Sequence, residues 1–345
     1  MYPKDFNYKM PAEWEAHERT FISWPVKDSM CHPDNHENVC AGYAGFIKAI
    51  AEFEPVSVLV NSNELENVKK LFEEPNIELL PIEHNDAWLR DNGPTFVLDE
   101  EGNRAGVNWN FNAWGGKYAP WDLDDEVAPK ILENYNIKKF DAPLVMEGGS
   151  LHTDGEGTLL TTEECLLNPN RNPDLNREQI EVYLKQYLNI EKVIWLKRGL
   201  SGDETDGHVD NIACFAAPGK IIMQTCDDPS DENYKITLEN LEILNNSTDA
   251  KGRKLEIIQI SQPPRADYKG ERLTLSYLNF YFVNDGIILP TFGGNAAEAD
   301  KKAEEVLNLA FPDRKIRAVD GIEVIKEGGN VHCTTQQMPS PKNLK

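Results

Sequence analysis

Two distant segments of the sequence carry residue types that together could perform covalent catalysis. Cys333 follows the double glycine Gly328-Gly329, and His208 lies far upstream among several carboxylates. A cysteine with a distant histidine is typical of a thiol nucleophile and its proton shuttle, which meet in the fold rather than in the sequence. The glycines would let substrate and backbone approach the sulfur closely. The alternative is a buried structural thiol, the common state of a lone cysteine.

The residues around His208 predict how its ring is held. If residues 206–210 are extended, Asp206, His208 and Asp210 face the same side of the strand. Two flanking carboxylates would orient the imidazole and raise its pKa, which makes the imidazolium a competent proton donor. On the same assumption His332 points away from its neighbour Cys333, so we do not assign it as the proton partner of that thiol.

Metal binding is the other interpretation of these histidines. His208 and Asp210 could chelate an ion, but no further histidine cluster with ligand spacing accompanies them. A separate group of thiols and imidazoles consists of Cys31, His32, His36 and Cys40. Its spacing matches no zinc site, so we interpret it as a loop followed by the start of a helix.

Aromatic and acidic residues recur in tight turns elsewhere in the sequence. Trp88 could stack on a planar cation while Asp91 accepts a fork of N–H donors, unless that aspartate only caps a turn. Trp114, followed by two glycines, marks a second aromatic turn or a hairpin corner over the core. Glu147 stands at the end of an apolar strand, where the alternative is a solvated turn residue.

These motifs lie within a weak internal repeat of a hairpin, a helix and a further strand. The hairpins are expected at 95–98 with 105–109, 150–153 with 158–162, 211–216 with 221–225, and 275–283 with 287–290. Helical spacing of apolar residues predicts helices at 64–72, 177–187, 232–244 and 296–309. Short strands are expected at 56–60, 193–196, 256–260 and 316–318, and residues 21–26 and 43–53 could complete the circle.

One such unit cannot bury its own apolar face, so the repeat predicts an α/β fold of units arranged about a central axis. The helices would form the outer layer. The residues that stand at equivalent points of successive units are Asp91, Glu147, His208, Asp210 and Cys333. We therefore expect them to converge on one site. The alternative is an ordinary mixed α/β domain whose turns look alike because turn chemistry is generic.

The composition bounds the class of ligand. The chain has 345 residues, 35 of them basic and 58 acidic, for a net charge of −23. This balance argues against nucleic acid and anionic membranes as partners and favours small cations, although it also serves solubility. We expect no signal peptide and no membrane-spanning segment. The six cysteines are scattered, which favours reduced thiols and a cytoplasmic protein.

Taken together, the motifs resemble the guanidine-modifying superfamily of penteins. More closely, the chain is similar to the agmatine deiminases of the bacterial-type peptidylarginine deiminase family. The resemblance covers essentially the whole chain, and its motifs lie at 10–14, 24–25, 88–94, 111–116, 147–150, 159–168, 205–210 and 328–333. It implies a single catalytic domain over 1–345, built from ββαβ modules as a five-bladed α/β propeller with pseudo-fivefold symmetry.

The resemblance also implies roles for individual residues. Cys333 would attack the guanidinium carbon, and Asp91 and Asp210 would bind the guanidinium nitrogens. His208, supported by Glu147, would protonate the departing ammonia and then activate water. The intermediate would be a covalent thiouronium, and the product of agmatine would be N-carbamoylputrescine. The remaining substrate contacts are expected from Trp88, Asp86, Trp114, Glu204, Gly328 and Gly329. Neither a metal nor an organic cofactor is implied, and homodimers or larger assemblies are common in the family.

The substrate is inferred from the charges around the motifs. A site for free arginine or peptidylarginine would need a cationic group of the protein to meet the carboxylate or backbone of the substrate. The motif segments instead offer the acids Asp203, Glu204 and Asp206. Glu204 matches the family position near the distal amine of agmatine. Arg90 and Arg171 leave arginine-type substrates as an alternative. A non-catalytic polyamine-binding protein does not need a thiol, and a metal-dependent ureohydrolase would need metal clusters that the sequence lacks.

The carboxylates that bind a guanidinium would also affect the nucleophile. Negative charges beside an empty site raise the pKa of a thiol. A cationic substrate would offset this effect. We therefore expect that much of the Cys333 thiolate forms only when substrate is bound.

Overall fold

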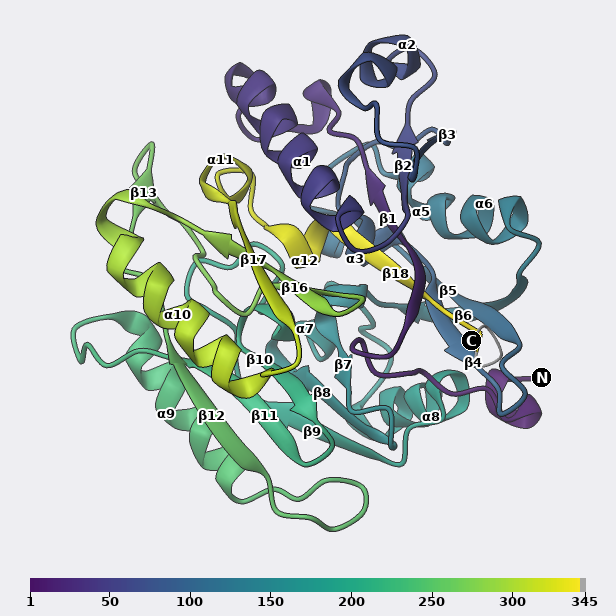
Figure 1. Ribbon diagram of the computed structural model, residues 1–345. Coiled ribbons are helices and arrows are strands. Elements are labelled where there is room, and N and C mark those ends of the chain that lie inside the picture. Colours follow the sequence, from purple (N-terminus) through teal and green to yellow (C-terminus); the bar gives the residue numbers. More distant parts are fainter. Residues whose placement is uncertain (342–345) are drawn as a thin grey trace.

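The computed structural model describes residues 1–341 (Figure 1). In this range, five sheets share one connectivity, in which two antiparallel strands are followed by a third strand parallel to the second. Parallel strands cannot be joined by a tight turn, and in each sheet a helix lies between them in the sequence. The predicted α/β class and the ββαβ module are therefore confirmed.

One of these sheets joins the two ends of the described chain. It contains β18 (Thr335–Pro339), β1 (His17–Ser23), β2 (Val56–Val60) and β3 (Ile77–Pro81), with α1 (His36–Ala51) as its crossover helix. β18 runs antiparallel to β1, with Thr335 opposite Ile22. The opening residues thus form a fifth module with a strand from the far end of the chain, whereas closure of a circle stays a prediction.

The four other sheets follow one another along the sequence. The second contains β4 (Thr95–Leu98), β5 (Arg104–Asn110) and β6 (Lys138–Val145) with α6 (Val127–Asn134), and the third contains β7 (His152–Thr153), β8 (Thr158–Thr162) and β9 (Lys192–Leu196) with α8 (Arg177–Leu188). The fourth contains β10 (Ala213–Ala217), β11 (Lys220–Thr225) and β12 (Glu256–Ser261) with α9 (Glu232–Asn245), and the fifth contains β15 (Tyr281–Val283), β16 (Gly286–Thr291) and β17 (Lys315–Asp320) with α10 (Ala297–Ala310).

Short elements lie in the connections between strands and between sheets. They are α2 (Leu65–Val68), α3 (Leu89–Asn92), α4 (Ala113–Gly116), α5 (Asp122–Asp125), α7 (Glu163–Leu166), α11 (Ile322–Ile325), α12 (Val331–Thr334) and the small hairpin β13 (Asp267–Tyr268) with β14 (Glu271–Arg272). Among residues 1–341, no helix is both long and apolar enough to cross a bilayer.

The connecting segments meet in the interior of the molecule. α3 contacts both α12 and the 3-10 turn η5 (Gly148–Ser150), and η5 contacts the 3-10 turn η6 (Val209–Asn211). In Figure 1 the long helices α1, α10, α9 and α8 lie at the periphery, whereas α3 and α12 lie further inside. Segments from four different sheet connections are thus brought together. The pseudo-fivefold symmetry of the modules stays a prediction. The single domain over 1–345 also stays a prediction, since residues 342–345 lie outside the described range.

The hairpins form where the sequence supplies residues that tolerate a left-handed backbone. The turn between β7 and β8 has Gly155 at φ 71° and Gly157 at φ 103°, and the turn between β10 and β11 has Gly219 at φ 75°. β8 is buried along its whole length because it is the middle strand of its sheet. The similar turns of the sequence therefore indicate a repeated structural unit rather than an ordinary mixed α/β domain.

Several expected elements differ in extent. Residues 275–283 were expected to form one strand, but only Tyr281–Val283 pair in β15. The preceding residues bend, and they place Asn279 against α12 through a hydrogen bond to the His332 amide. Residues 148–150 form a 3-10 turn, so the hairpin expected to begin at Ser150 begins at His152.

Three further elements, α6, β6 and β18, were not expected from the sequence. α6 contains Pro129, which is tolerated only because it stands in the first turn of the helix, and β6 contains Pro143. β18 is rich in polar residues that are buried, among them Gln337, whose side-chain oxygen accepts a hydrogen bond from Arg90. A proline interrupts the otherwise amphipathic pattern of α6 and the otherwise alternating pattern of β6, and β18 is too polar to resemble an apolar strand.

The glycine at the middle of α1 offers a test of the fold. Gly45 is exposed, and a Cβ built there would meet nothing within 4 Å. We expect Gly45→Ala to raise the free energy of unfolding by about 0.5–1 kcal/mol, because alanine loses less backbone entropy in a helix. Chemical denaturation measures this change. Gly42→Ala is the matched control, since its Cβ would lie 2.8 Å from Cγ2 of Val324. Equal gains at both positions would contradict this packing of α1.

Candidate active site

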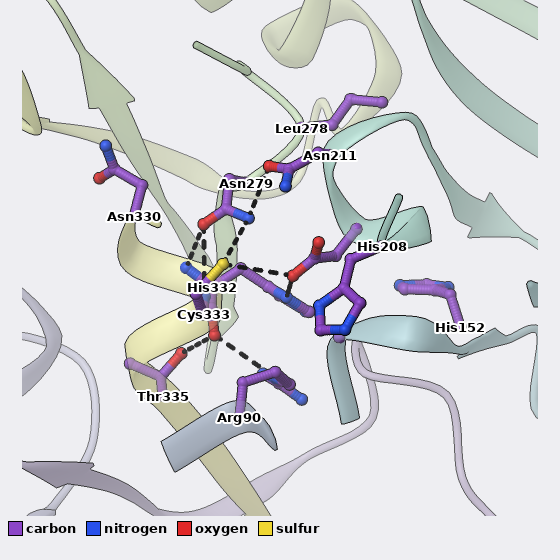
Figure 2. A network of polar contacts seen from close by, with 12 residues as sticks. Arg90, His152, His208, Asn211, Leu278, Asn279, Asn330, His332, Cys333 and Thr335 are labelled. Carbon is purple, nitrogen blue, oxygen red and sulfur yellow. Dashed lines mark hydrogen bonds and ion pairs between the residues drawn. The ribbon is translucent and has the colours of Figure 1, made fainter. Parts of the chain in front are cut away.

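Cys333 lies in α12, and its side chain is buried at 5% exposure. Asn279 donates its Nδ2–H to the sulfur at 3.1 Å, and the sulfur lies 3.5 Å from Oδ2 of Asp210 (Figure 2). Burial raises the pKa of the Cys333 thiol well above its usual range, and the carboxylates of Asp210 and Asp91 raise it further. The free protein therefore holds a protonated thiol at neutral pH.

The double glycine brings an aromatic ring onto the nucleophile. A Cβ at Gly329 would lie 2.5 Å from Cζ3 of Trp88 and 2.9 Å from Cβ of Cys333. Gly328 has φ 109°, in the left-handed region that favours glycine. The close approach expected from these glycines is therefore present, and any larger residue at Gly329 would displace either the indole or the cysteine.

A pocket opens beside Cys333. Its walls come from the loop after β1, from α1 and α12, and from the turns around α3 and α4. The lining residues are Pro25, Val26, Ser29, Met30, Cys31, Val39, Tyr43, Asp86, Ala87, Trp88, Asp91, Trp114, Tyr118, Glu204, Thr205, Glu327, Gly328, Gly329 and Cys333. Four carboxylates are present, and no arginine or lysine of residues 1–341 is among the lining residues. The pocket therefore suits a ligand with positive charge.

Asp91 accepts hydrogen bonds on both of its oxygens. The indole N–H of Trp114 donates to Oδ2 at 2.9 Å, and the amide of Gly149 donates to Oδ1 at 3.0 Å. Burial raises the pKa of Asp91 to about 6; His208 opposes this shift, while Asp210 and Glu147 add to it. Asp86, at the same pocket, has a pKa raised to about 7 by burial and by the nearby Asp124.

Trp114 is held in an unusual backbone conformation. Ala113 and Trp114 have φ 51° and 54°, and the two glycines that follow are also in the left-handed region. Non-glycine residues in this region cost about 1 kcal/mol or more each, and such residues cluster at ligand-binding sites. The strained turn directs the indole N–H at Asp91 and its ring into the pocket.

His208 lies between two carboxylates, but not the pair expected from its immediate neighbours. Nδ1 lies 3.7 Å from Oδ1 of Asp91, and Nε2 lies 3.7 Å from Oε2 of Glu147. Neither ring nitrogen has a hydrogen-bond partner among the described residues. Burial opposes the charged ring, but Asp91, Cys165 and Glu147 raise the pKa of His208 well above its usual range. The ring is therefore an imidazolium with room to donate a proton.

The expectation of an extended segment over residues 206–210 is wrong. Asp206 has φ 63°, and Val209–Asn211 form a 3-10 turn, so alternate residues do not share a face. Asp206 instead pairs with Arg171 at 2.8 Å and with Lys117 at 2.7 Å. Asp210 still reaches the site, because the turn points it at Cys333.

The two arginines considered as partners of a substrate carboxylate are both occupied. Arg171 is fully buried, and its Nε donates to Oε1 of Glu147 at 2.6 Å. Arg90 is buried at 2% exposure, 3.3 Å from Oε1 of Glu13. Neither lines the pocket. Asp203 does not line it either, because its carboxylate accepts hydrogen bonds from Thr205.

Within the described chain, one group of side chains could offer ligand atoms to a metal ion. The carboxylate of Glu147, the thiol of Cys165 and the ring of His208 bring such atoms within 4.8 Å of one another. The guanidinium of Arg171 already occupies one oxygen of Glu147, and a neighbouring cation opposes the binding of a second. Metal independence stays a prediction. His36 and Cys40 lie in the first turns of α1, which is the helix start expected there.

The structure thus brings together Cys333, Asp91, His208, Glu147 and Asp210 at one point. The expected substrate contacts Trp88, Asp86, Trp114, Glu204, Gly328 and Gly329 all line the pocket. The chemical roles of these residues stay predictions. Asn279 was not expected at the site, and the sequence indicated no role for Glu13 or His332. Asn279 lies in a segment that reads as an apolar strand, so nothing in its surroundings marked it.

Known proteins match this chain over nearly its whole length. A family model described as Porphyromonas-type peptidyl-arginine deiminase matches residues 9–339. An agmatine deiminase of Pseudomonas aeruginosa strain LESB58 is 44% identical, with 99% of this chain and 98% of the relative aligned. The solved agmatine deiminase of Enterococcus faecalis has a TM-score of 0.93 at 39% identity, covering 99% and 98%. The solved DDAH from Pseudomonas aeruginosa has a TM-score of 0.50 at 13% identity, with 94% of this chain and 100% of that chain aligned. This likeness shows the fold alone. These likenesses confirm the pentein fold.

The protonation state of Cys333 can be tested directly. In the ligand-free protein, inactivation by iodoacetamide should be slow at pH 7 and should still accelerate above about pH 9, because burial and two carboxylates raise the thiol pKa. Mass spectrometry of the Cys333 peptide separates this thiol from the other five cysteines. Asp210→Asn should move the inflection to lower pH. A plateau near pH 7 in the unsubstituted protein would show an ionised resting thiol and contradict this account.

Proposed function

We propose that this chain, which belongs to the Porphyromonas-type peptidyl-arginine deiminase family, hydrolyses agmatine to N-carbamoylputrescine and ammonia. One observation carries the proposal. Buried polar atoms without hydrogen-bond partners in the described residues gather beside the thiol of Cys333, namely Oδ1 of Asp210 and both ring nitrogens of His208. Buried polar groups are normally paired, so such a cluster marks the place of a polar ligand.

A guanidinium group fits the charges at this point. Asp91 and Asp210 are carboxylates on different connections between sheets, and a Cβ at Gly149 would lie 2.9 Å from Oδ1 of Asp91 and 3.0 Å from Oδ2 of Asp210. A planar cation can donate N–H groups to both while its central carbon faces Cys333. Trp88 and Trp114 provide aromatic surface for the plane of the cation.

Binding of the cation prepares the nucleophile. The positive charge offsets the carboxylates that raise the pKa of the Cys333 thiol, so the proton leaves to solvent as the substrate binds. Asn279 keeps the sulfur in place by donating an N–H to it. A guanidinium is strongly stabilised by resonance, so it is a poor electrophile. A thiolate held in a near-attack geometry provides a covalent route to hydrolysis that water alone lacks.

The reaction then proceeds in two halves. Cys333 Sγ forms a bond to the guanidinium carbon, the His208 imidazolium gives its proton to a terminal nitrogen, and the carbon–nitrogen bond breaks to release ammonia. An S-alkylthiouronium remains on the enzyme. His208, now neutral, takes one proton from water and the hydroxyl adds to the carbon. The carbon–sulfur bond then breaks to regenerate the thiolate, and the remaining hydroxyl proton is lost to solvent, which leaves the neutral ureido product. Glu147 keeps the His208 ring charged and oriented.

The other acids of the pocket favour agmatine over arginine. Glu204, Asp86 and Glu327 line the pocket together with Asp91, and Tyr118 donates its hydroxyl to Glu204. A second cation at the distal end of the ligand is attracted by these acids, whereas the α-carboxylate of arginine would be repelled and would find no basic partner among the lining residues. Lys117, the nearby cation, is paired with Asp206.

The alternatives fit the site less well. A polyamine-binding protein would need the carboxylates but not the buried thiol or the histidine between acids. A metal-dependent ureohydrolase would need two clusters of ligands for two ions. A role in putrescine formation or agmatine breakdown, a cytoplasmic location, and a homodimer or larger assembly are further expectations of the proposal.

Ammonia release from three substrates tests the function. In the presence of a chelator we expect turnover of agmatine, and none of arginine or a blocked arginyl peptide, because only agmatine carries a distal cation without a carboxylate. Cys333→Ala should abolish turnover, and Cys226→Ala, a buried cysteine that does not line the pocket, should retain it. Turnover of arginine would preserve the chemistry but overturn the specificity. Loss of activity with chelator would overturn metal independence.

The space between the carboxylates provides a second test. A Cβ at Gly149 would lie 2.5 Å from Nδ1 of His208 as well as close to Asp91 and Asp210. We expect Gly149→Ala to lower kcat/KM for agmatine by about 100-fold or more, because the methyl group misplaces three site residues at once. Gly45→Ala serves as the control for a harmless added methyl group. Near-normal activity of Gly149→Ala in a folded protein would exclude this arrangement.

A further inference from the structure

A buried chain of charged groups lies behind the nucleophile, and the reaction described above does not use it. Nδ1 of His332 lies 3.0 Å from Oδ2 of Asp210, and Nε2 of the same ring lies 3.0 Å from both oxygens of Glu13. All three side chains are buried at 2–3% exposure or less. This series of contacts begins at Glu13, near the start of the sequence, and ends at Asp210, whose carboxylate contacts the sulfur of Cys333.

The geometry fixes the protonation state of this chain. Ionised carboxylates can only accept hydrogen bonds, and each ring nitrogen of His332 faces one. Both nitrogens must therefore carry protons, which makes the ring an imidazolium. Burial and Arg90 oppose this charge, but Glu13 and Asp210 raise the pKa of His332 above its usual value. The charge on His332 is thus permanent near neutral pH.

Glu13 is anchored from two other sides. Nη1 of Arg90 lies 3.3 Å from Oε1, and Nε2 of His152 lies 3.6 Å from Oε2. The amide of Phe215 donates to Nδ1 of His152, so the proton of that ring is on Nε2, facing Glu13. Arg90 also donates to the main-chain oxygen of His332 (Figure 2). Glu13 therefore stays ionised, and its pKa is held well below its usual range despite burial.

The two oxygens of Asp210 have different surroundings. Oδ2 is taken by His332 at 3.0 Å and by the sulfur of Cys333 at 3.5 Å, whereas Oδ1 is buried and has no partner within residues 1–341. A carboxylate held by one oxygen keeps a single orientation. The free oxygen is then presented to whatever cation enters the site.

We propose that Glu13 and His332 are positioning residues that keep Asp210 ionised and oriented, with one oxygen on the imidazolium and the other presented to the guanidinium of the substrate. The inference rests on the proposed function of the site. It assigns His332 a role through Asp210 rather than as a proton partner of Cys333. The neighbouring position of His332 and Cys333 in the sequence then has a physical reason, since one turn of helix places the ring and the thiol on the same carboxylate.

The proposal predicts a pH effect with a definite sign. The charged or titratable groups that face Asp210 and His332 are Glu13, Arg90, Asp91, His152, Asp203, His208 and Cys333. Burial alone would raise the pKa of Asp210, but the hydrogen bond and charge of His332 bring it below its usual value. Asp86, a buried carboxylate that lines the pocket without a cation beside it, has a pKa raised to about 7 by burial and by the nearby Asp124. Without the imidazolium, Asp210 should likewise be protonated near neutral pH.

The structure provides a matched control pair for this test. His17 and Glu54 are also a buried histidine and glutamate, with Nδ1 of His17 3.0 Å from Oε1 of Glu54. Within the described residues neither side chain contacts Asp210 or His332; Nε2 of His17 lies 2.8 Å from the main-chain oxygen of Glu13, so Glu54→Gln is the stricter control of the two. A purely structural role of buried His–Glu pairs would make the two pairs behave alike. A positioning role would separate them.

The experiment compares His332→Gln and Glu13→Gln with His17→Gln and Glu54→Gln. For each variant, kcat and KM for agmatine are measured from about pH 6 to 9.5, with the melting temperature as a check of folding. We expect His332→Gln to lower kcat/KM about tenfold or more near pH 6.5, mainly through KM, and to recover much of it above about pH 8.5, where Asp210 ionises again. Its acid limb should move up by about one pH unit or more. Glu13→Gln should shift the profile in the same direction by less.

The control pair decides between the two interpretations. His17→Gln and Glu54→Gln should lose thermal stability without any shift of the acid limb. Equal pH profiles in all four variants, or a loss in His332→Gln that is the same at every pH, would overturn the proposal. If His332→Gln does not fold, the isosteric Glu13→Gln carries the same test.

Binding provides a readout that does not need turnover. Calorimetric titration of agmatine into Cys333→Ala, with and without His332→Gln, should show the same loss of affinity at low pH and recovery at high pH. Absence of turnover in the unsubstituted protein would refute the proposed function. A pH-independent affinity in the double variant would refute the positioning role by itself.

Discussion

Removal of carboxylates from water is the constraint that the rest of this structure must satisfy. A buried carboxylate is costly unless a cation and hydrogen bonds accompany it. The groups away from the ligand meet this condition, since Glu147 has Arg171 and Glu13 has Arg90. The groups that face the pocket do not meet it fully, and burial raises the pKa of Asp91 to about 6 and that of Asp86 to about 7. A small cation is therefore bound most favourably where the protein supplies acids without bases.

This concentration of charge is possible because the backbone segments at the centre approach one another very closely. A Cβ at Gly148 would lie 2.1 Å from the main-chain oxygen of Arg90, and one at Gly199 would lie 2.0 Å from Cα of Gly207. Glycine is required at such positions whatever the local φ, because no side chain can be placed between the segments. The same segments carry the carboxylates, so close packing of the backbone sets the distances of the site.

The sequence was sufficient for the parts of the molecule that follow local rules. Turn residues located the hairpins, helical spacing located α8, α9 and α10, and equivalent positions in the repeat brought Cys333, Asp91 and Glu147 to one point. It was insufficient where tertiary contacts override local preference. The polar strand β18 is buried because its glutamines find partners such as Arg90, and Asn279 reaches Cys333 only because residues 275–280 bend. The short-range geometry of residues 206–210 likewise depended on a left-handed residue that composition does not reveal.

The pairing of β18 with β1 has a consequence for how the protein is made. Cys333 lies directly before β18, and the partner of β18 is a strand from the beginning of the chain. Contacts between such distant residues form late, because the intervening loop must be closed first. During synthesis on the ribosome, the acidic side of the site can therefore assemble long before the thiol arrives. A chain that is released before this segment is made lacks both the nucleophile Cys333 and the His332 ring that contacts Asp210, so reactivity is acquired only when β18 has paired with β1.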